Sequence, residues 1–516
     1  MSLQHRKNLY SITVFLSSAM LMVLEIDAGR LIAPFTGSSL YSWTSIIGVV
    51  LAGLSLGNWL GGRLAGGRNG HRVLGLALTG SALTTLLVLP LIVLVAGPIQ
   101  HQHGGPVWTS LMLVTSLFFL PALMLGIISP LATALYLEID DKTGSVLGKM
   151  HALAATGSIF GTFITGYVLV QWLGTRFILV IVSCALMILA IPFLWSQDRR
   201  RLLLSSVFFA FILSGAISWV SGGLENPCES ETGYYCLRVV DEYADGTDSN
   251  TGGENSAQTV ARTLVIDHMV HSTNVLQNPG EIWTPYVHAM DNIIDLHFSN
   301  RDALSYFFAG GGAFTHPRAV ATRFPGAELI VSEIDPGVTE IAIKRLDLDP
   351  SVMTIRHQDT RTLLETYPGS KFDVVITDVF HDVGVPPHLV TREFNRLVAS
   401  RLKDNGLYLV NVIDLFPSNQ MVMSMYRTLK ETFSHVGVWI ERQEQDQARL
   451  TFVFSASNRP ETRDSIRSAD GVPRTWFNIA EFIEQQSLQY DAPILTDDYA
   501  PIEKLISPLL TSGAGH

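Results

Sequence analysis

The sequence contains few charged residues and no basic surplus. Only 16% of its 516 residues are Asp, Glu, Lys or Arg, and its mean hydropathy is +0.29, so it is too apolar for a wholly soluble protein. The formal net charge of −11 argues against a nucleic-acid partner, because binding to phosphates relies on Lys and Arg. Histidines are numerous, but no pair has metal-ligand spacing with a third ligand, so we predict no metal site.

The apolar excess lies in the first 222 residues. Seven segments there are long enough to span a bilayer: 10–33, 39–61, 73–97, 107–137, 147–171, 175–195 and 202–221. The first apolar run is too long for a cleavable signal and lacks a small-residue cleavage site, so we expect a retained helix. These segments predict an all-α transmembrane bundle of about seven helices in a multi-pass plasma-membrane protein that contacts membrane lipid.

The orientation follows from the basic residues of the short loops. They fall on alternate loops, at Arg6 and Lys7, then Arg63, Arg68 and Arg72, then Lys142 and Lys149, then Arg199, Arg200 and Arg201. This pattern places the N-terminus in the cytoplasm and, after seven spans, the rest of the chain outside the cell. The fifth segment is the weakest, but without it the basic cluster at 199–201 would lie outside.

Two of the three cysteines, Cys228 and Cys236, follow the last predicted span, and Cys184 lies inside a span. A disulfide between Cys228 and Cys236 suits an oxidising exterior. Two ordinary free thiols are the alternative.

The first predicted helix carries Glu25, Asp27 and Arg30. Ionisable groups at that depth are costly unless they are paired or face water, and Asp27 and Arg30 are spaced to pair on one face. We leave open whether they form a polar site inside the bundle or a pair that fixes helix packing. Small residues at four-residue spacing, in Gly53-x-x-x-Gly57-x-x-x-Gly61 and Gly157-x-x-x-Gly161, predict close helix contacts.

The second half is organised around residues 303–335. An apolar run ends in Gly310, Gly311 and Gly312, and Pro317 then opens an amphipathic segment, as where a strand turns into a helix. A second apolar run ends in Glu333, where an acid usually holds a ribose. The glycine fingerprint is incomplete, because Thr315 replaces its last glycine, and a turn without a ligand remains an alternative.

Two further acids, Asp359 and Asp378, also follow short apolar runs. With Glu333 they would all lie at the carboxyl ends of parallel strands, where open α/β sheets bind ligands. Between the last span and this core, a polar linker with the low-complexity run 244–258 is expected to be a loop beside a small β-subdomain.

Residues from about 260 to 455 resemble the polyamine aminopropyltransferase (spermidine synthase) family, a branch of the class I methyltransferase-like (Rossmann-like) α/β fold. The whole chain resembles bacterial proteins in which that domain is fused to membrane helices. The matching pieces are Leu264-Val265-Ile266-Asp267, Tyr286, Gly310-Gly311-Gly312, Glu333-Ile334-Asp335, Asp359, Asp378-Val379-Phe380-His381-Asp382 and Pro387-His388-Leu389-Val390-Thr391-Arg392-Glu393.

The resemblance implies a role for each of these acids. Asp378 matches the catalytic aspartate, which would take a proton from an amine nucleophile, and Asp382 falls near the second, diamine-binding aspartate. Glu333 matches the ribose-binding acid, Asp359 the acid that contacts adenine, and Tyr286 the substrate-side tyrosine. Strand-end acids that only cap helices, and a tyrosine that belongs to the core, are the structural alternatives.

The sequence departs from the family at three positions. Ala313 replaces the aspartate that holds the ammonium of decarboxylated S-adenosylmethionine and would repel the carboxylate of S-adenosylmethionine, so either compound is an expected cofactor. His271 replaces a glutamine and His288 a glutamate, and both changes would weaken a pocket for a cationic polyamine.

We therefore divide the chain into a transmembrane helical domain (1–222), a linker with a small β-subdomain (223–300), a spermidine synthase-like α/β domain (301–460) and a C-terminal helical tail (461–516). Asp497 and Asp498 in that tail either lie near the site or cap a helix, and we favour the cap.

Two functions fit the sequence. The first is a membrane-tethered transferase that uses an S-adenosyl cofactor and transfers an aminopropyl group to an amine, or a methyl group to an amine or envelope lipid. The second is a transporter or an envelope-lipid transport accessory protein whose α/β domain has lost catalysis. An exterior location favours the second, because such cofactors are cytosolic, and retention of the strand-end acids favours the first. A homodimer is left open.

Overall fold

The computed structural model describes residues 2–65, 69–100, 105–195, 200–243, 259–380, 384–441, 448–460, 463–468 and 471–511. The chain divides into two compact units, Met1–Cys228 and Glu229–His516. The low-complexity run 244–258 and the predicted substrate residue Asp382 lie outside the described residues.

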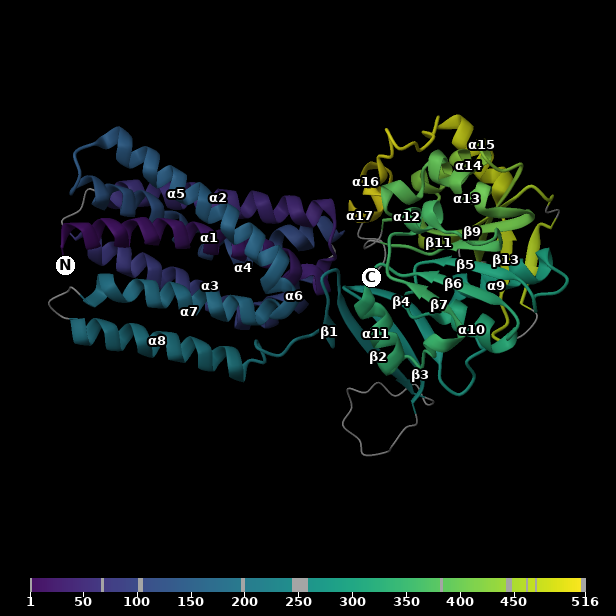
Figure 1. Ribbon diagram of the computed structural model, residues 1–516, viewed down its shortest axis with the longest axis horizontal. Helices are drawn as coiled ribbons and strands as arrows, with labels where there is room; N and C mark the ends of the chain where they lie inside the picture. Colours follow the sequence, from purple (N-terminus) through teal and green to yellow (C-terminus); the bar gives the residue numbers. More distant parts are fainter. Residues whose placement is uncertain are drawn as a thin grey trace. The chain divides into compact units, whose positions relative to one another are not determined.

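The first unit is a bundle of long helices that run alongside one another (Figure 1). Its helices are α1 (Leu3–Thr36), α2 (Leu40–Leu64), α3 (Gly70–Gln100), α4 (Gly105–Leu137), α5 (Thr143–Ile164), a π-helical turn (Thr165–Leu169), α6 (Val170–Trp172), α7 (Thr175–Trp195) and α8 (Arg200–Val220).

Six helices of this unit are long and apolar enough to cross a membrane: α1 to α4, the continuous helix Thr143–Trp172, and α7. They include the fifth predicted span, the weakest in the sequence, and they indicate a membrane protein. The seventh predicted span falls on α8, whose apolar part, Leu204–Val220, is shorter. Seven spans, and the side of the membrane on which each end lies, stay predictions.

The glycine pattern produces the close helix contacts that it predicts. A Cβ on Gly57 of α2 would overlap the carbonyl oxygen of Leu123 in α4, and a Cβ on Gly161 of α5 would overlap that of Ala19 in α1. In α1, Asp27 is fully buried, whereas Glu25 and Arg30 are partly exposed. The predicted Asp27–Arg30 pair stays a prediction.

The second unit begins with a small antiparallel sheet in the order β1-β2-β3-β4. Its strands are β1 (Ser230–Glu231), β2 (Cys236–Tyr243), β3 (Thr259–Ile266) and β4 (Met269–Val275), and α9 (Pro285–His297) follows. Cys228 and Cys236 are disulfide-bonded, which confirms the predicted pairing, and Cys184 is free.

The main sheet has nine strands in the order β12-β13-β10-β11-β9-β8-β5-β6-β7. The strands are β5 (Ser305–Ala309), β6 (Glu328–Ser332), β7 (Thr354–Arg356), β8 (Phe372–Thr377), β9 (Leu402–Phe416), β10 (His435–Glu441), β11 (Ala448–Ser457), β12 (Ser465–Arg467) and β13 (Thr475–Asn478). Neighbouring strands in the part β9-β8-β5-β6-β7 are parallel. Neighbouring strands in the part β12-β13-β10-β11-β9 are antiparallel.

Helices cover both faces of this sheet, with α12 to α15 on one side and α9 to α11 on the other (Figure 1). Their bounds are α10 (Thr315–Arg323), α11 (Pro336–Arg345), α12 (Thr360–Thr366), α13 (Arg392–Arg401), α14 (Gln420–Lys430), α15 (Ala480–Gln489), α16 (Ile502–Leu505) and α17 (Ser507–Thr511), with 3-10 turns at Pro350–Val352 and Pro387–Leu389. The helices on both faces explain why all five residues of β5 are buried.

The sequence analysis predicted a helical C-terminal tail, and this prediction is wrong in part, because the tail also contains two strands. Its strands β12 and β13 extend the edge of the main sheet, where Ile466 and Trp476 are 4% and 2% exposed. Strands of three and four residues are too short to show the alternation from which a strand is read.

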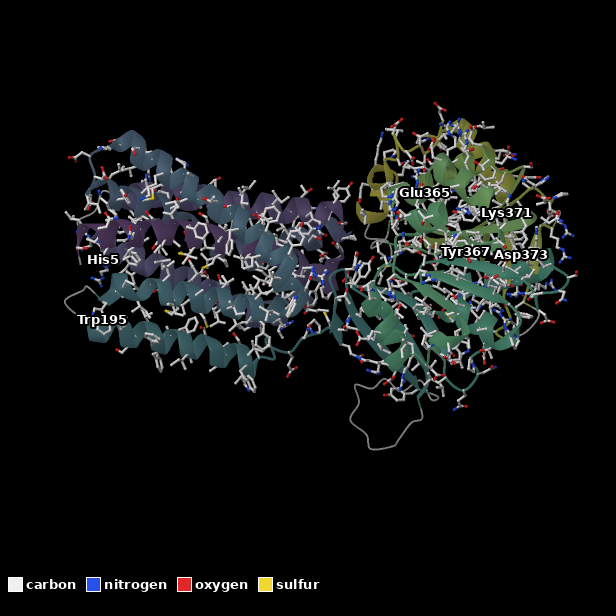
Figure 2. The ribbon with its side chains drawn as sticks, viewed as in Figure 1. His5, Trp195, Glu365, Tyr367, Lys371 and Asp373 are labelled. Carbon is white, nitrogen blue, oxygen red and sulfur yellow. The ribbon has the colours of Figure 1, made fainter. Side chains whose placement is uncertain are left out.

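The two ends of the parallel strands differ in their chemistry. At the amino end lies Asp373 of β8, which is labelled in Figure 2. It accepts hydrogen bonds from the backbone and hydroxyl of Ser305 and pairs with Lys403. These contacts tie neighbouring strands together. The carboxyl end carries the predicted ligand-binding residues, and the strand order reverses there between β6 and β8, on either side of β5.

Candidate active site

The glycine turn after β5 brings two strand ends into direct contact. Gly310 has a φ of +90°, and a Cβ on it would overlap the backbone carbonyl oxygen of Asp378. Only glycine fits such a position without strain. The Asp378 N–H in turn donates to the carbonyl of Ala309 at 2.9 Å, so the turn and the end of β8 form one backbone unit.

Glu333, after β6, holds this turn from the other side. Its carboxylate accepts hydrogen bonds from the N–H of Gly311 at 2.8 Å and from that of Asp335 at 2.9 Å. The side chain is buried, and burial raises the pKa of Glu333 although these N–H groups favour the carboxylate. Each carboxylate oxygen can accept a second hydrogen bond, so Glu333 still has acceptor capacity toward the pocket that it lines.

Asp378 is positioned by two side-chain donors. The hydroxyl of Tyr286 donates to one oxygen at 3.0 Å, and the amide of Asn411 in β9 donates to the other at 2.9 Å. Burial raises the pKa of Asp378 to about 6, against the effect of the Tyr286 hydrogen bond. A carboxylate with a pKa near the working pH is suited to accept a proton.

Asp359 caps the N-terminus of α12 and also contacts the loop that follows β8. It accepts a hydrogen bond from the backbone N–H of Thr362 at 3.0 Å, and the ring of His388 lies 2.8 Å from its other oxygen. Burial opposes its ionisation, but these two contacts outweigh burial and hold the pKa of Asp359 below its ordinary value.

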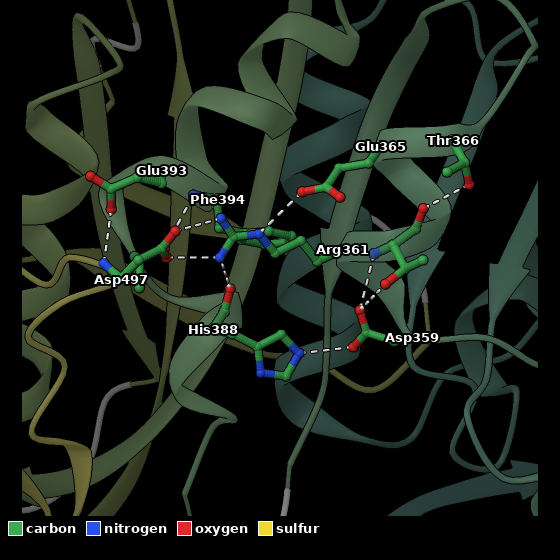
Figure 3. A network of polar contacts seen from close by, with 10 residues as sticks. Asp359, Arg361, Glu365, Thr366, His388, Glu393, Phe394 and Asp497 are labelled. Carbon is green, nitrogen blue, oxygen red and sulfur yellow. Dashed lines mark hydrogen bonds and ion pairs between the residues drawn. The ribbon is translucent and has the colours of Figure 1, made fainter.

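A polar network connects this corner to the C-terminal tail (Figure 3). Arg361 donates to both oxygens of Asp497, at 2.7 and 2.6 Å, and to the carbonyl of His388 at 3.2 Å. The hydroxyl of Thr391 donates to Asp497 at 2.7 Å, and the Asp497 N–H donates to Glu393 at 3.0 Å. We had favoured a helix cap for Asp497. In the structure its side chain instead binds Arg361 and Thr391, and so anchors the loop before α13.

These elements enclose a pocket of about 460 Å³, which we call the donor pocket. It is lined by Gly310, Gly312, Glu333, Asp359, Asp378 and His271, by the loop residues Pro386, Pro387, His388 and Leu389, and by Tyr234, Tyr235, Ile266, Ser332, Ile334, Val338, Gln358, Thr360, Val379 and Phe380. Burial lowers the pKa of His271 to about 4, so its ring is neutral at pH 7.

The structure thus gathers most of the predicted site residues. Gly310, Gly312, Glu333, Asp359, Asp378 and His271 line one pocket, Gly311 and Tyr286 hydrogen-bond to two of its acids, and Asp382 lies outside the described residues. His288 lines neither this pocket nor the one beside Tyr286. It is 3% exposed and packs edge-on against Trp476, so a direct role in substrate binding has no support from its position.

The sequence analysis missed several residues that shape the site. Asn411 and Arg361 come from segments with no motif of their own, and Thr391, although it lies in the matched piece 387–393, had no role assigned; their polar side chains find partners only in the folded chain. Ala313, at the position of the family's aspartate, is fully buried, and its carbonyl accepts a hydrogen bond from Asn274 at 2.8 Å. No group of three or more metal-ligating side chains is found among the residues that the structure describes.

Known proteins are similar to this part of the chain. A family model described as the spermine/spermidine synthase domain matches residues 318–441. The polyamine aminopropyltransferase of Vibrio vulnificus (strain CMCP6) is 26% identical over 204 residues, which are 38% of this chain and 67% of that protein. That of Thermococcus kodakarensis is 28% identical over 137 residues, 25% of this chain and 48% of that protein. The crystal structure of a probable spermidine synthase from Corynebacterium glutamicum aligns with a TM-score of 0.44 and 21% identity, and the match covers 52% of this chain and 95% of that one.

The second unit is an α/β domain, and its residues 318–441 match the spermine/spermidine synthase domain. The C-terminal part of the chain carries a spermidine synthase domain, as the motifs indicated, and the N-terminal apolar helices fit a membrane domain.

Proposed function

We propose that this protein is a membrane-anchored transferase that moves a group from an S-adenosyl donor to an amine, with Asp378 as the base. The observation that carries the proposal is the contact between Asp378 and the glycine turn, because it places a carboxylate with a pKa near 6 beside the donor pocket.

The residues present fit an adenosyl compound. The Gly310 turn has no side chain that would obstruct a ligand, and Glu333 and Asp359 offer carboxylate oxygens on the pocket lining, where hydroxyl and amino groups can donate to them. The bound donor supplies a carbon made reactive by a positively charged sulfur. The similar proteins of Vibrio vulnificus and Thermococcus kodakarensis are named polyamine aminopropyltransferases, so aminopropyl transfer is the activity that their names support.

The chain's own groups would act on the amine. Asp378, ionised and held by Tyr286 and Asn411, would accept a proton from the incoming ammonium, which leaves a neutral amine with a free lone pair on nitrogen. The nitrogen then forms a bond to the donor carbon, the carbon–sulfur bond breaks, and its electron pair stays on sulfur as a thioether. Asp378 needs no movement to act, because its two hydrogen bonds fix its orientation.

A second candidate function is an accessory protein whose α/β domain no longer catalyses. The Cys228–Cys236 disulfide favours it, because a disulfide suits an extracytoplasmic compartment, where S-adenosyl compounds are scarce. On this proposal the N-terminus is cytoplasmic, the α/β domain is extracytoplasmic, and the partner is an envelope lipid.

Calorimetry on the detergent-solubilised full chain with methylthioadenosine separates the two proposals. Binding by the wild type, weakened by about tenfold to a hundredfold in Glu333→Ala, is expected if a ribose hydrogen bond is lost. Glu340→Ala, an exposed acid of α11, should bind like the wild type. No binding by the wild type would leave the accessory function as the better reading.

A further inference from the structure

A hairpin closed by a disulfide forms part of the donor pocket. Strand β1 pairs with the start of β2, and the turn between these strands carries Tyr234 and Tyr235, which both line the pocket. The bond between Cys228 and Cys236 joins the chain just before β1 to the first residue of β2. We call residues 228–237 the disulfide hairpin. One wall of the donor pocket therefore belongs to a covalently closed segment.

Hydrogen bonds alone give the β1 side of this hairpin little support. Strand β1 pairs with β2 at two positions, with Ser230 opposite Leu237 and Glu231 opposite Cys236. The N–H of Glu229 adds one hydrogen bond, to the carbonyl of Leu237 at 2.8 Å. A ladder this short is marginally stable in water. Strand β1 is also the edge of its sheet, whereas β2 pairs with β3 on its other side, so the disulfide is the strongest tie between β1 and the sheet.

The β2 end of the disulfide is fixed in the fold. The N–H of Cys236 donates to the carboxylate of Asp267 at 2.9 Å, and its carbonyl accepts a hydrogen bond from the Asp267 N–H at 2.8 Å. Cys228 and Cys236 are 8% and 4% exposed. The bond thus holds the chain before β1 at a defined place on β2 and excludes open arrangements of the hairpin, which is how a disulfide favours an ordered state.

The tip of the disulfide hairpin also contacts the acids of the donor pocket. The hydroxyl of Thr232 donates to the carboxylate of Asp335, and the N–H of Asp335 donates to Glu333 at 2.9 Å. A Cβ on Gly337, at the start of α11, would overlap the side chain of Thr232, so the tip packs closely against this helix. A hairpin that opens would therefore disturb both the tyrosine wall and the support of Glu333.

We propose that the Cys228–Cys236 bond positions this wall, so that the oxidised protein binds the donor and the reduced protein binds it much more weakly. The inference rests on the proposed function, which supplies the class of ligand, an adenosyl compound. The reductant is a dithiol: the S–S bond breaks, each cysteine sulfur gains one electron and one proton, and the dithiol closes to its own disulfide. The hairpin then opens in a fraction of the molecules, and Tyr234 and Tyr235 leave the wall.

The test is calorimetry with methylthioadenosine on the full chain in detergent, oxidised and after dithiothreitol treatment, with alkylation and mass spectrometry to count free thiols. We expect reduction to weaken binding by about tenfold, as for a hairpin that is ordered about a tenth of the time, and reoxidation to restore it. Because both sulfurs are buried, the double variant Cys228→Ala/Cys236→Ala tests the same point without a reductant. It should bind as weakly as the reduced wild type and should not respond to dithiothreitol.

Cys184→Ala is the matched control, because Cys184 is a free cysteine in α7. It should bind like the wild type and respond to dithiothreitol in the same way. Affinity within about twofold of the oxidised wild type, in the fully reduced protein or in the double variant, would overturn the inference. The melting temperature of each protein is measured, and all titrations are done below it.

The variant Tyr234→Ala separates loss of the wall from loss of the fold. Tyr234 is 49% exposed, so its truncation spares the core, and binding should weaken by about threefold to tenfold with the disulfide intact. Tyr490→Ala, at an exposed tyrosine of the tail, should bind like the wild type. Unchanged affinity in Tyr234→Ala would overturn the inference. No binding by the oxidised wild type would refute this inference and the proposed function together, whereas binding that reduction leaves unchanged would refute this inference alone.

Discussion

Removing the Asp497 side chain should weaken ligand binding in the donor pocket, although Asp497 lies outside the pocket lining. Asp497 does not line the pocket, but through Arg361 and Thr391 it anchors the loop whose residues Pro386 to Leu389 form one wall. Asp497→Ala removes two contacts to Arg361 and one to Thr391. If the wall must hold this arrangement to contact a ligand, the lost free energy appears as lost affinity.

The magnitude follows from those contacts. The Arg361 and Asp497 side chains are 22% and 39% exposed, so the ion pair, screened by solvent, contributes about 0.5–1 kcal/mol. The Thr391 hydrogen bond adds about 1 kcal/mol. A total of about 1.5–2 kcal/mol corresponds to a weakening of about tenfold to thirtyfold, as an upper limit.

The assay is calorimetry with methylthioadenosine on wild type, Asp497→Ala and Arg361→Gln, with the double variant to measure their coupling. Asp491→Ala, which breaks another Asp–Arg pair of the same tail, is the control and should leave affinity unchanged. The hydrogen bond from Arg361 is the main cause that lowers the pKa of Asp497, so the wild-type advantage should persist at neutral pH and disappear as the pH falls below about 4. A lower melting temperature with affinity within twofold of wild type would refute the reasoning.

Three other predictions concern the base, the donor and the topology. The pKa of Asp378 is raised to about 6, and the base must be ionised, so kcat/KM should rise between about pH 5 and 7 and then level off. The variant Asp378→Asn should lose about 100-fold or more in rate. A wild-type rate that is flat across this pH range would contradict the role of Asp378 as base. Since position 313 carries a buried alanine and no carboxylate, wild type should bind S-adenosylmethionine at least as well as its decarboxylated form, and a preference above about tenfold for the latter would show that another acid replaces the missing one. Alkaline phosphatase fused after Pro460 should be active and green fluorescent protein dark; a bright fluorescent fusion without phosphatase activity would place the domain in the cytoplasm.

The sequence predicted those features that depend on local pattern. Long apolar runs gave the helices of the first unit, and the glycine turn with Glu333 gave the strand–turn–helix unit, because both are encoded within a few consecutive residues. Tyr286 and Asp378 are 92 positions apart, and only the family resemblance connected them before the structure did.

Other contacts had no local signal. Arg361 and Asp497 are 136 positions apart, and an arginine or aspartate on a surface segment has the same appearance in sequence whether it is solvated or paired. Asn411 lies on a long buried strand where an apolar residue is the expectation, and its amide is satisfied by Asp378. Strand β13 is defined by its pairing with β10, and β12 by its pairing with β13, so both depend on neighbouring strands more than on their own residues.

The close contact between Gly310 and Asp378 means that one substitution can disturb both the glycine turn and the end of β8. One added methyl group at Gly310 would displace the carbonyl of Asp378, and with it the carboxylate that Tyr286 and Asn411 hold. On the proposed function, Gly310→Ala would therefore shift the ligand-facing turn and the base together, and no substitution at this position would change one while sparing the other. A chain of this design would lose recognition and chemistry in the same mutational step, without passing through a form that binds but does not react.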